Sequence, residues 1–80
     1  MSKEEILEKV IHIIREEFED EDIEVSFDTT ASDVKGWDSL AHLSLMHEIE
    51  GEFNIKFTMG EIQGFKNIGE VIESILKHLG

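Results

Sequence analysis

The sequence predicts an all-α fold, a four-helix bundle with three longer helices, a short third helix and a long loop between the first two helices. Three segments carry apolar residues at spacings of three and four, which places those residues on one face of a helix. A residue that can cap a helix precedes each segment. The chain shows no repeat or linker, so we expect one domain over residues 1–80.

The first helix is expected at about residues 3–18. Ser2 and Glu5 have the spacing of a capping box, in which each side chain accepts a hydrogen bond from the other residue's backbone N–H. The apolar residues behind this cap form one stripe broad enough to face a core, namely Ile6, Leu7, Val10, Ile13, Ile14 and Phe18.

Residues 19–35 lack a sustained period and are expected to form the long loop, with a short turn of helix near residues 32–34. Ile23, Val25 and Phe27 are interpreted as anchors that hold the loop on the bundle. The four acids at residues 19–22 invite a calcium hypothesis, but the segment lacks the glycine of an EF-hand loop. We therefore expect no metal site, and an acidic metal-binding protein is kept as a weak alternative.

The second helix is expected at residues 39–53, after the turn Gly36-Trp37-Asp38-Ser39-Leu40. If Asp38 is the N-cap, Ser39 takes the first helical position and its hydroxyl is free. A phosphate at that hydroxyl would meet unpaired backbone N–H groups and the positive end of the helix dipole. The alternative makes Ser39 itself the N-cap, which is the commoner use of serine before a helix.

A helical projection places His42 near the centre of the core face of this helix. We expect a core histidine whose hydrogen bonds are satisfied by the loop, or alternatively a group that senses charge near Ser39. The opposite stripe begins with Leu40, carries Ser44 and His47, and is flanked by Glu48 and Glu50.

Two further helices complete the prediction. Thr58 and Glu61 have capping-box spacing before a short third helix that ends at about residue 63 and is weakened by glycines. Asn67 caps the fourth helix, whose apolar face is the cleanest in the chain and consists of Ile68, Val71, Ile72, Ile75, Leu76 and Leu79.

The charge balance restricts the partners. With 7 basic and 19 acidic residues, the chain has a formal net charge of −12, which disfavours nucleic acid and anionic membranes and favours basic protein surfaces. The first residues do not resemble a signal peptide, and no apolar run reaches the ~20 residues of a membrane span. We expect a cytoplasmic monomer without membrane insertion.

The chain offers little support for catalysis. Ser39 and His42 leave the second helix in different directions, so the histidine is not expected to act as a base on the serine. The four histidines lack the spacing of metal ligands. We therefore predict that the chain is not an enzyme and that Ser39 has a role other than catalysis.

Asp38-Ser39-Leu40 at the start of the second helix resembles the attachment motif of acyl carrier proteins. The acidic loop, the Glu-Gly-Glu-Phe end of the second helix and the Phe65-Lys66-Asn67-Ile68 segment that leads into the last helix extend the resemblance over nearly the whole chain. The resemblance implies that a phosphopantetheinyl transferase attaches 4'-phosphopantetheine from coenzyme A to Ser39. The arm's thiol would then carry acyl groups as thioesters, and Asp38 would hold the turn.

The resemblance also implies partners and a pocket. The partners would be acyl-loading, condensing or modifying enzymes with basic patches, recognised through Leu40, Ala41, Ser44, His47, Glu48 and Glu50. An acyl chain that folds back would lie between the second and third helices, near Leu43, Met46, Ile62 and Phe65.

The pathway follows less directly from the sequence. Fatty-acid-synthesis carriers usually place acids where this chain has Ala41 and Ser44, and Trp37 before the motif resembles specialised carriers. Fatty-acid, lipid-modification and polyketide biosynthesis are the expected settings. The alternatives are an amino-acyl or peptidyl carrier and a non-carrier acidic interaction module.

Overall fold

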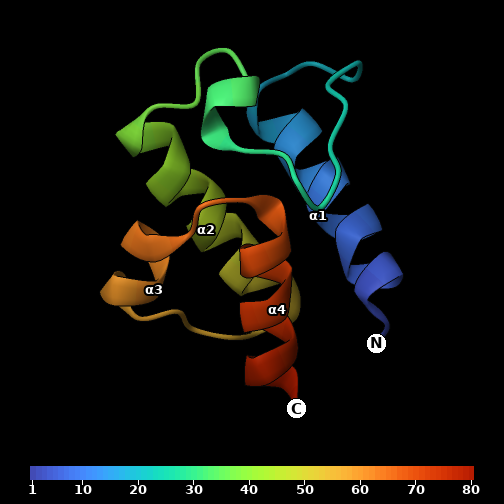
Figure 1. Ribbon diagram of the computed structural model, residues 1–80, viewed down its shortest axis with the longest axis vertical. Helices are drawn as coiled ribbons and strands as arrows, with labels where there is room; N and C mark the ends of the chain where they lie inside the picture. Colours follow the sequence, from blue (N-terminus) through green and yellow to red (C-terminus); the bar gives the residue numbers. More distant parts are fainter.

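The computed structural model describes residues 1–80 and contains helices only (Figure 1). The elements are α1 (Lys3–Glu17), a single 3-10 turn η1 (Ala31–Asp33), α2 (Ser39–Phe53), α3 (Met59–Gly64) and α4 (Ile68–Leu79). The all-α prediction is confirmed, with each helix within about two residues of its expected position.

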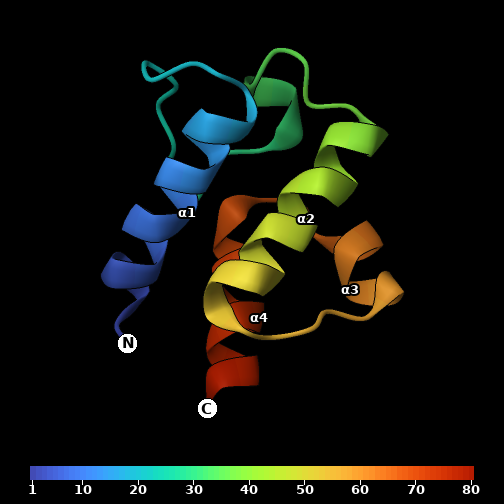
Figure 2. The ribbon, with the colours of Figure 1, turned by 180° about the vertical axis from the view of Figure 1, so that it is seen from behind.

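The three longer helices enclose the core. α1 packs against both α2 and α4, while the short α3 lies on the other side of α2 and α4 (Figure 2). Both chain termini lie towards the end of the bundle opposite the start of α2. The side chains at the centre are fully buried, and each large aliphatic one contributes about 1.5–3 kcal/mol of hydrophobic free energy; they include Ile6, Ile14, Leu45, Met46, Ile49, Ile72 and Ile75.

Side chains cap every α-helix at its N-terminus. Ser2 with Glu5 and Thr58 with Glu61 form the predicted capping boxes. Asn67 accepts a hydrogen bond from the Glu70 backbone N–H at the start of α4. These caps satisfy backbone donors that the first turn of a helix leaves without partners.

Apolar packing and backbone hydrogen bonds both hold the long loop on the bundle. Ile23, Val25 and Phe27 are half-buried and pack against the core, as predicted, although their alternation forms no strand. Carbonyl oxygens of the loop accept hydrogen bonds from the first turn of α4, with Ile68 N 2.9 Å from Thr29 O and Gly69 N 2.7 Å from Phe27 O. The loop therefore closes one end of the bundle and leads into the start of α2.

Candidate functional site

The turn before α2 presents Ser39. Asp38 is the N-cap, and its Oδ1 accepts a hydrogen bond from the Ala41 backbone N–H at 2.9 Å. Ser39 is the first helical residue and is exposed, so its hydroxyl is not the cap of the helix. Gly36 has a φ of 89°, a left-handed conformation that glycine adopts without strain. Of the two cap assignments, the one with Asp38 is confirmed.

Trp37 fixes this turn to the bundle. Its ring packs against Phe18 at the end of α1, with 5.5 Å between ring centroids. Its indole Nε1 donates a hydrogen bond to His42 Nδ1 at 3.0 Å. Trp37, before Ser39, and His42, after it, are thereby held in place, whereas Ser39 itself is exposed.

His42 is half-buried and has a second partner, since its Nε2 lies 2.8 Å from the backbone oxygen of Ile62 in α3. Both ring nitrogens therefore have partners. Trp37, in the turn that ends the long loop, is the kind of partner that the sequence led us to expect, whereas the Ile62 carbonyl of α3 was not predicted.

A cavity of about 550 Å³ opens beside Ser39, between α2 and α3. Three of the four residues predicted for an acyl pocket line it, namely Leu43, Ile62 and Phe65. Met46 does not, because its side chain is fully buried in the central core one turn further along α2. The other lining residues come from η1, the turn, α2 and α3, and they are Ala31, Trp37, Asp38, Ser39, His42, Met59 and Gln63.

The predicted outward stripe of α2 is present. Leu40 is 78% exposed, Ser44, His47 and Glu48 are exposed as well, and Ala41 is half-buried. Met59, at the start of α3, is also exposed and lines the cavity. Leu40 and Met59 are thus exposed apolar side chains, while the carboxylate of Asp38 lies directly beside Ser39.

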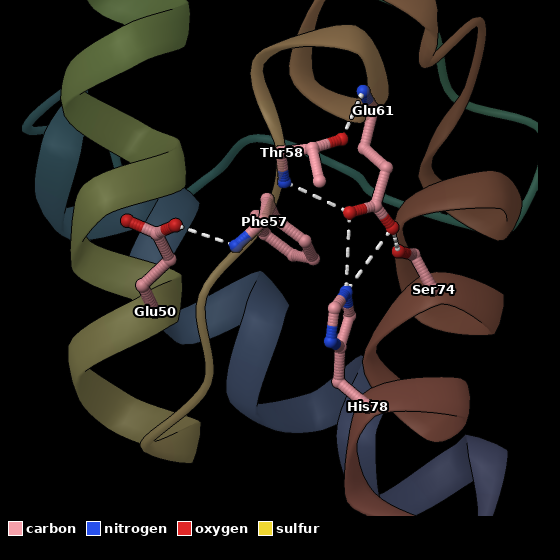
Figure 3. Close-up of polar contacts among 6 residues, drawn as sticks. All are labelled: Glu50, Phe57, Thr58, Glu61, Ser74 and His78. Carbon is pink, nitrogen blue, oxygen red and sulfur yellow. Dashed lines mark hydrogen bonds and ion pairs between the residues drawn. The ribbon is translucent and has the colours of Figure 1, made fainter.

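The structure contradicts the prediction that Glu50 takes part in the recognition of partner enzymes. The side chain is buried, and its Oε2 accepts a hydrogen bond from the Phe57 backbone N–H at 2.7 Å (Figure 3). His47 Nδ1 lies 3.1 Å from the other carboxylate oxygen. Glu50 lies on the side of α2 that faces the segment leading to α3, so a partner docked on the exposed side would not reach it.

Glu61 links α3 to α4. Its carboxylate accepts hydrogen bonds from the Ser74 hydroxyl and the Thr58 backbone N–H and lies 3.1 Å from His78 Nε2 (Figure 3). The Ser74 hydrogen bond is the main reason that the pKa of Glu61 falls to about 2, and the Thr58 bond and His78 lower it further. Sequence reasoning found the cap but missed the partners in α4, which follow 13 and 17 residues later.

Two other features were sought in the structure, a metal site and a membrane-spanning helix. No group of three or more His, Cys, Asp or Glu side chains is arranged to hold a metal ion. None of the helices combines the length and the apolar character that crossing a membrane requires.

Comparison with known proteins gives a consistent result. Residues 8–75 match the family described as "Phosphopantetheine attachment site". The chain is 32% identical over 79 residues to the acyl carrier protein of Thermotoga maritima, covering 99% of this chain and 98% of that protein. It is 33% identical over 75 residues to the acyl carrier protein of Prochlorococcus marinus, covering 94% of each.

A solved structure agrees with these relatives. The solution NMR structure of the holo acyl carrier protein from Geobacter metallireducens superposes with a TM-score of 0.85 at 36% identity, covering 92% of this chain and 85% of that chain. These matches cover the helices, the turn and the cavity-lining residues described above, and they support a carrier and not the alternative of a non-carrier interaction module. The chain belongs to the acyl carrier proteins, which are not enzymes but carry acyl groups on a covalently attached 4'-phosphopantetheine.

Proposed function

We propose that Ser39 is the residue to which the 4'-phosphopantetheine arm is attached. The observation that carries the proposal is the division of roles at the start of α2, where Asp38 caps the helix and leaves the exposed Ser39 hydroxyl free. The phosphodiester formed there would lie at the positive end of the α2 dipole, which stabilises an anion.

The chemistry divides between this chain and a phosphopantetheinyl transferase. The Ser39 oxygen would form a bond to the phosphorus of coenzyme A that bears the pantetheine, the phosphoanhydride bond would break, and adenosine 3',5'-bisphosphate would leave. The hydroxyl proton would pass to a base of the transferase. The chain contains no cysteine, so the thiol that carries the acyl group comes from the arm alone.

Mass spectrometry tests the attachment. The protein is incubated with coenzyme A and a promiscuous phosphopantetheinyl transferase, and its intact mass is then measured. We expect the wild type and Ser32→Ala to gain one arm and Ser39→Ala to gain none; Ser32 is the matched control because it is an exposed serine outside the surface proposed for partner enzymes. An equal gain in Ser39→Ala, or no gain in the wild type, would overturn the proposal.

The cavity supports an apolar acyl group as the cargo. Leu43, Ile62 and Phe65 provide an apolar wall within reach of the turn that bears Ser39. Two-dimensional NMR spectra of the acylated protein and of the protein with a bare arm should differ at Ile62 and Phe65. Identical signals in both forms would instead favour a carrier that leaves its cargo exposed, as expected for an amino-acyl carrier.

We infer that partner enzymes approach the exposed side of α2 with a basic surface. Leu40, Ala41, Ser44, His47 and Glu48 would contact the partner directly. Because Glu50 is turned inward, Glu48 is the one exposed acid between Ser39 and Gly51, and the contact itself would be largely neutral. The net charge of −12 would act at longer range by steering a basic partner, so association should slow as salt is added. A cytoplasmic location and a monomeric state remain predictions.

A further inference from the structure

The hydroxyl of Ser44 connects the exposed side of α2 with the end of α1. Its Oγ donates a hydrogen bond to Glu17 Oε1 at 3.3 Å. Glu17 is the last residue of α1, and Ser44 is exposed on α2, four residues after Leu40 and on the same side of that helix. The bond therefore brings a carboxylate from α1 onto the surface that we assign to partner enzymes.

We propose that Glu17 is a charged recognition residue of this surface, and that it pairs with an arginine or lysine side chain of the enzymes that act at Ser39. The inference rests on the proposed function, because it requires those enzymes to cover the exposed side of α2. Glu17 belongs to another helix, so the spacing of residues within α2 does not reveal it.

A second contact fixes the end of α1 at this place. The residue after Glu17 is Phe18, whose ring packs against Trp37 in the turn before α2, with 5.5 Å between ring centroids. α1 also packs directly against α2. The carboxylate of Glu17 is therefore held in position before a partner arrives, which reduces the entropy that is lost on binding.

The charge of Glu17 is not neutralised within the chain. Its partner Ser44 offers a neutral hydroxyl, and none of the chain's ion pairs includes Glu17. The basic residue two positions earlier, Arg15, directs its Nε to the Ile23 carbonyl oxygen of the loop at 3.0 Å. A carboxylate has more acceptor sites than the one that Ser44 uses. Glu17 can therefore bind a basic side chain and keep its contact with Ser44.

The acids further along α2 do not replace this carboxylate. Glu52 forms an ion pair with Lys9 of α1, with 3.3 Å between Oε2 and Nζ. Glu48 is exposed but lies about one turn beyond Ser44, away from the start of the helix. Glu17 thus supplies a free carboxylate at the end of the surface where we propose that the arm is attached.

An enzyme that reaches Ser39 would also cover Glu17. Stable protein contacts bury about 800 Å² on each partner, which corresponds to a disc of about 16 Å radius. Ser44 follows Ser39 by about 7.5 Å along the helix axis. A contact centred on the start of α2 therefore includes Ser44 and the carboxylate bonded to it.

Calorimetric titration measures the contribution of Glu17 to docking. The probe is a promiscuous phosphopantetheinyl transferase with coenzyme A, and every carrier variant also bears Ser39→Ala, so that docking is measured without transfer of the arm. Attachment is judged by mass and docking by the Kd, so the two proposals can fail separately.

We expect Glu17→Gln to raise the Kd about three- to tenfold at low ionic strength, because a charge-assisted hydrogen bond becomes a neutral one. The new amide oxygen can still accept the Ser44 bond, so the end of α1 should stay in place. The difference from the parent protein should shrink at high ionic strength.

A matched control separates this contact from net charge. Glu8→Gln removes the same charge from an exposed position of α1 that forms no ion pair and lies about 13.5 Å before Glu17 along the helix axis. It should change the Kd less than about twofold, because it acts only through the long-range field.

A rescue variant tests the location of the charge. Adding Ser44→Glu to Glu17→Gln returns a carboxylate to the same place from α2, and it should restore most of the lost affinity. Equal Kd values for Glu17→Gln and its parent, an equal loss in Glu8→Gln, or no rescue by Ser44→Glu would overturn the proposal. Failure of the parent protein to bind the transferase would overturn it as well, whatever the mass measurement shows.

Discussion

The carboxylate of Glu50 accepts a hydrogen bond from the backbone N–H of Phe57, with 2.7 Å between Oε2 and the nitrogen. This contact joins α2 to the segment that leads into α3, and both residues are buried. Glu50 thus supports the fold and does not belong to the exposed side of α2 that we propose for the recognition of partner enzymes. It fixes where the chain turns from α2 towards the cavity.

Removal of this acceptor should lower stability. Glu50→Ala leaves the buried Phe57 N–H without a partner, which costs about 1–3 kcal/mol of unfolding free energy. Glu50→Gln keeps an amide oxygen in reach and should lose less. Glu48→Ala is the control, because this neighbouring acid is exposed and should change stability by no more than about 0.5 kcal/mol. Urea unfolding measures all three, and equal losses at positions 48 and 50 would contradict the assignment.

The Asp38 cap makes a separate prediction. Asp38→Ala removes the acceptor for the Ala41 N–H and should lower the free energy of unfolding by about 1 kcal/mol. Asp38→Asn caps about as well as aspartate and should restore most of that stability. Thermal unfolding of the two variants at one pH compares them. A stability of Asp38→Ala equal to that of the wild type would show that the cap contributes little.

Glu61 predicts an acid-dependent loss of stability. Its pKa is lowered from 4.5 to about 2 in the folded protein, so the folded state favours the ionised carboxylate. The resulting stabilisation is fully present above pH 4.5 and is lost as the pH falls towards 2, because the unfolded state binds the proton first.

The free energy of unfolding of the wild type and Glu61→Gln should be compared at pH 7, 4 and 3. We expect the advantage of the wild type to shrink across this series. Glu5→Gln is the control for a capping box without partners in another helix, since the pKa of Glu5 is lowered by its bonds with Ser2. A difference between wild type and Glu61→Gln that does not change with pH would contradict the proposed network.

Two glycines should respond in opposite directions to alanine. Gly51 lies within α2, and a Cβ added there would meet only open space, so Gly51→Ala should stabilise the protein by about 0.5–1 kcal/mol. A Cβ at Gly69 would lie 3.0 Å from the Phe27 carbonyl oxygen, which also accepts the Gly69 N–H. Gly69→Ala should therefore destabilise the protein. Urea unfolding decides, and stabilisation by Gly69→Ala would show that the loop yields easily.

Local patterns in the sequence were sufficient to predict the helices. Ser2 with Glu5 and Thr58 with Glu61 are partners only three residues apart, and their caps follow from spacing alone. The position of Ser39 likewise followed once Asp38 was taken as the cap. These features depend on neighbours along the chain, so they could be predicted without knowledge of the packing.

The remaining features depend on packing between distant segments. Apolar residues occur around much of α2, so its sequence did not show that Glu50 would face inward or that Met46 would lie beyond the cavity. The partner of His42 in α3 is 20 residues away, and the Ser74 partner of Glu61 lies in the next helix. Such contacts are set by how α3 docks, and no spacing rule within one helix reports them.

The location of both chain ends towards one end of the bundle has a practical consequence. Both termini lie towards the end of a body 32 Å long that is opposite the start of α2 (Figures 1 and 2). An affinity tag, a bead or another domain joined at either terminus would be attached at the end of the bundle away from the start of α2. The start of α2, where we propose that the arm is attached, would then remain accessible. A protein immobilised through either terminus is therefore suited to capturing the enzymes that act on the acyl group.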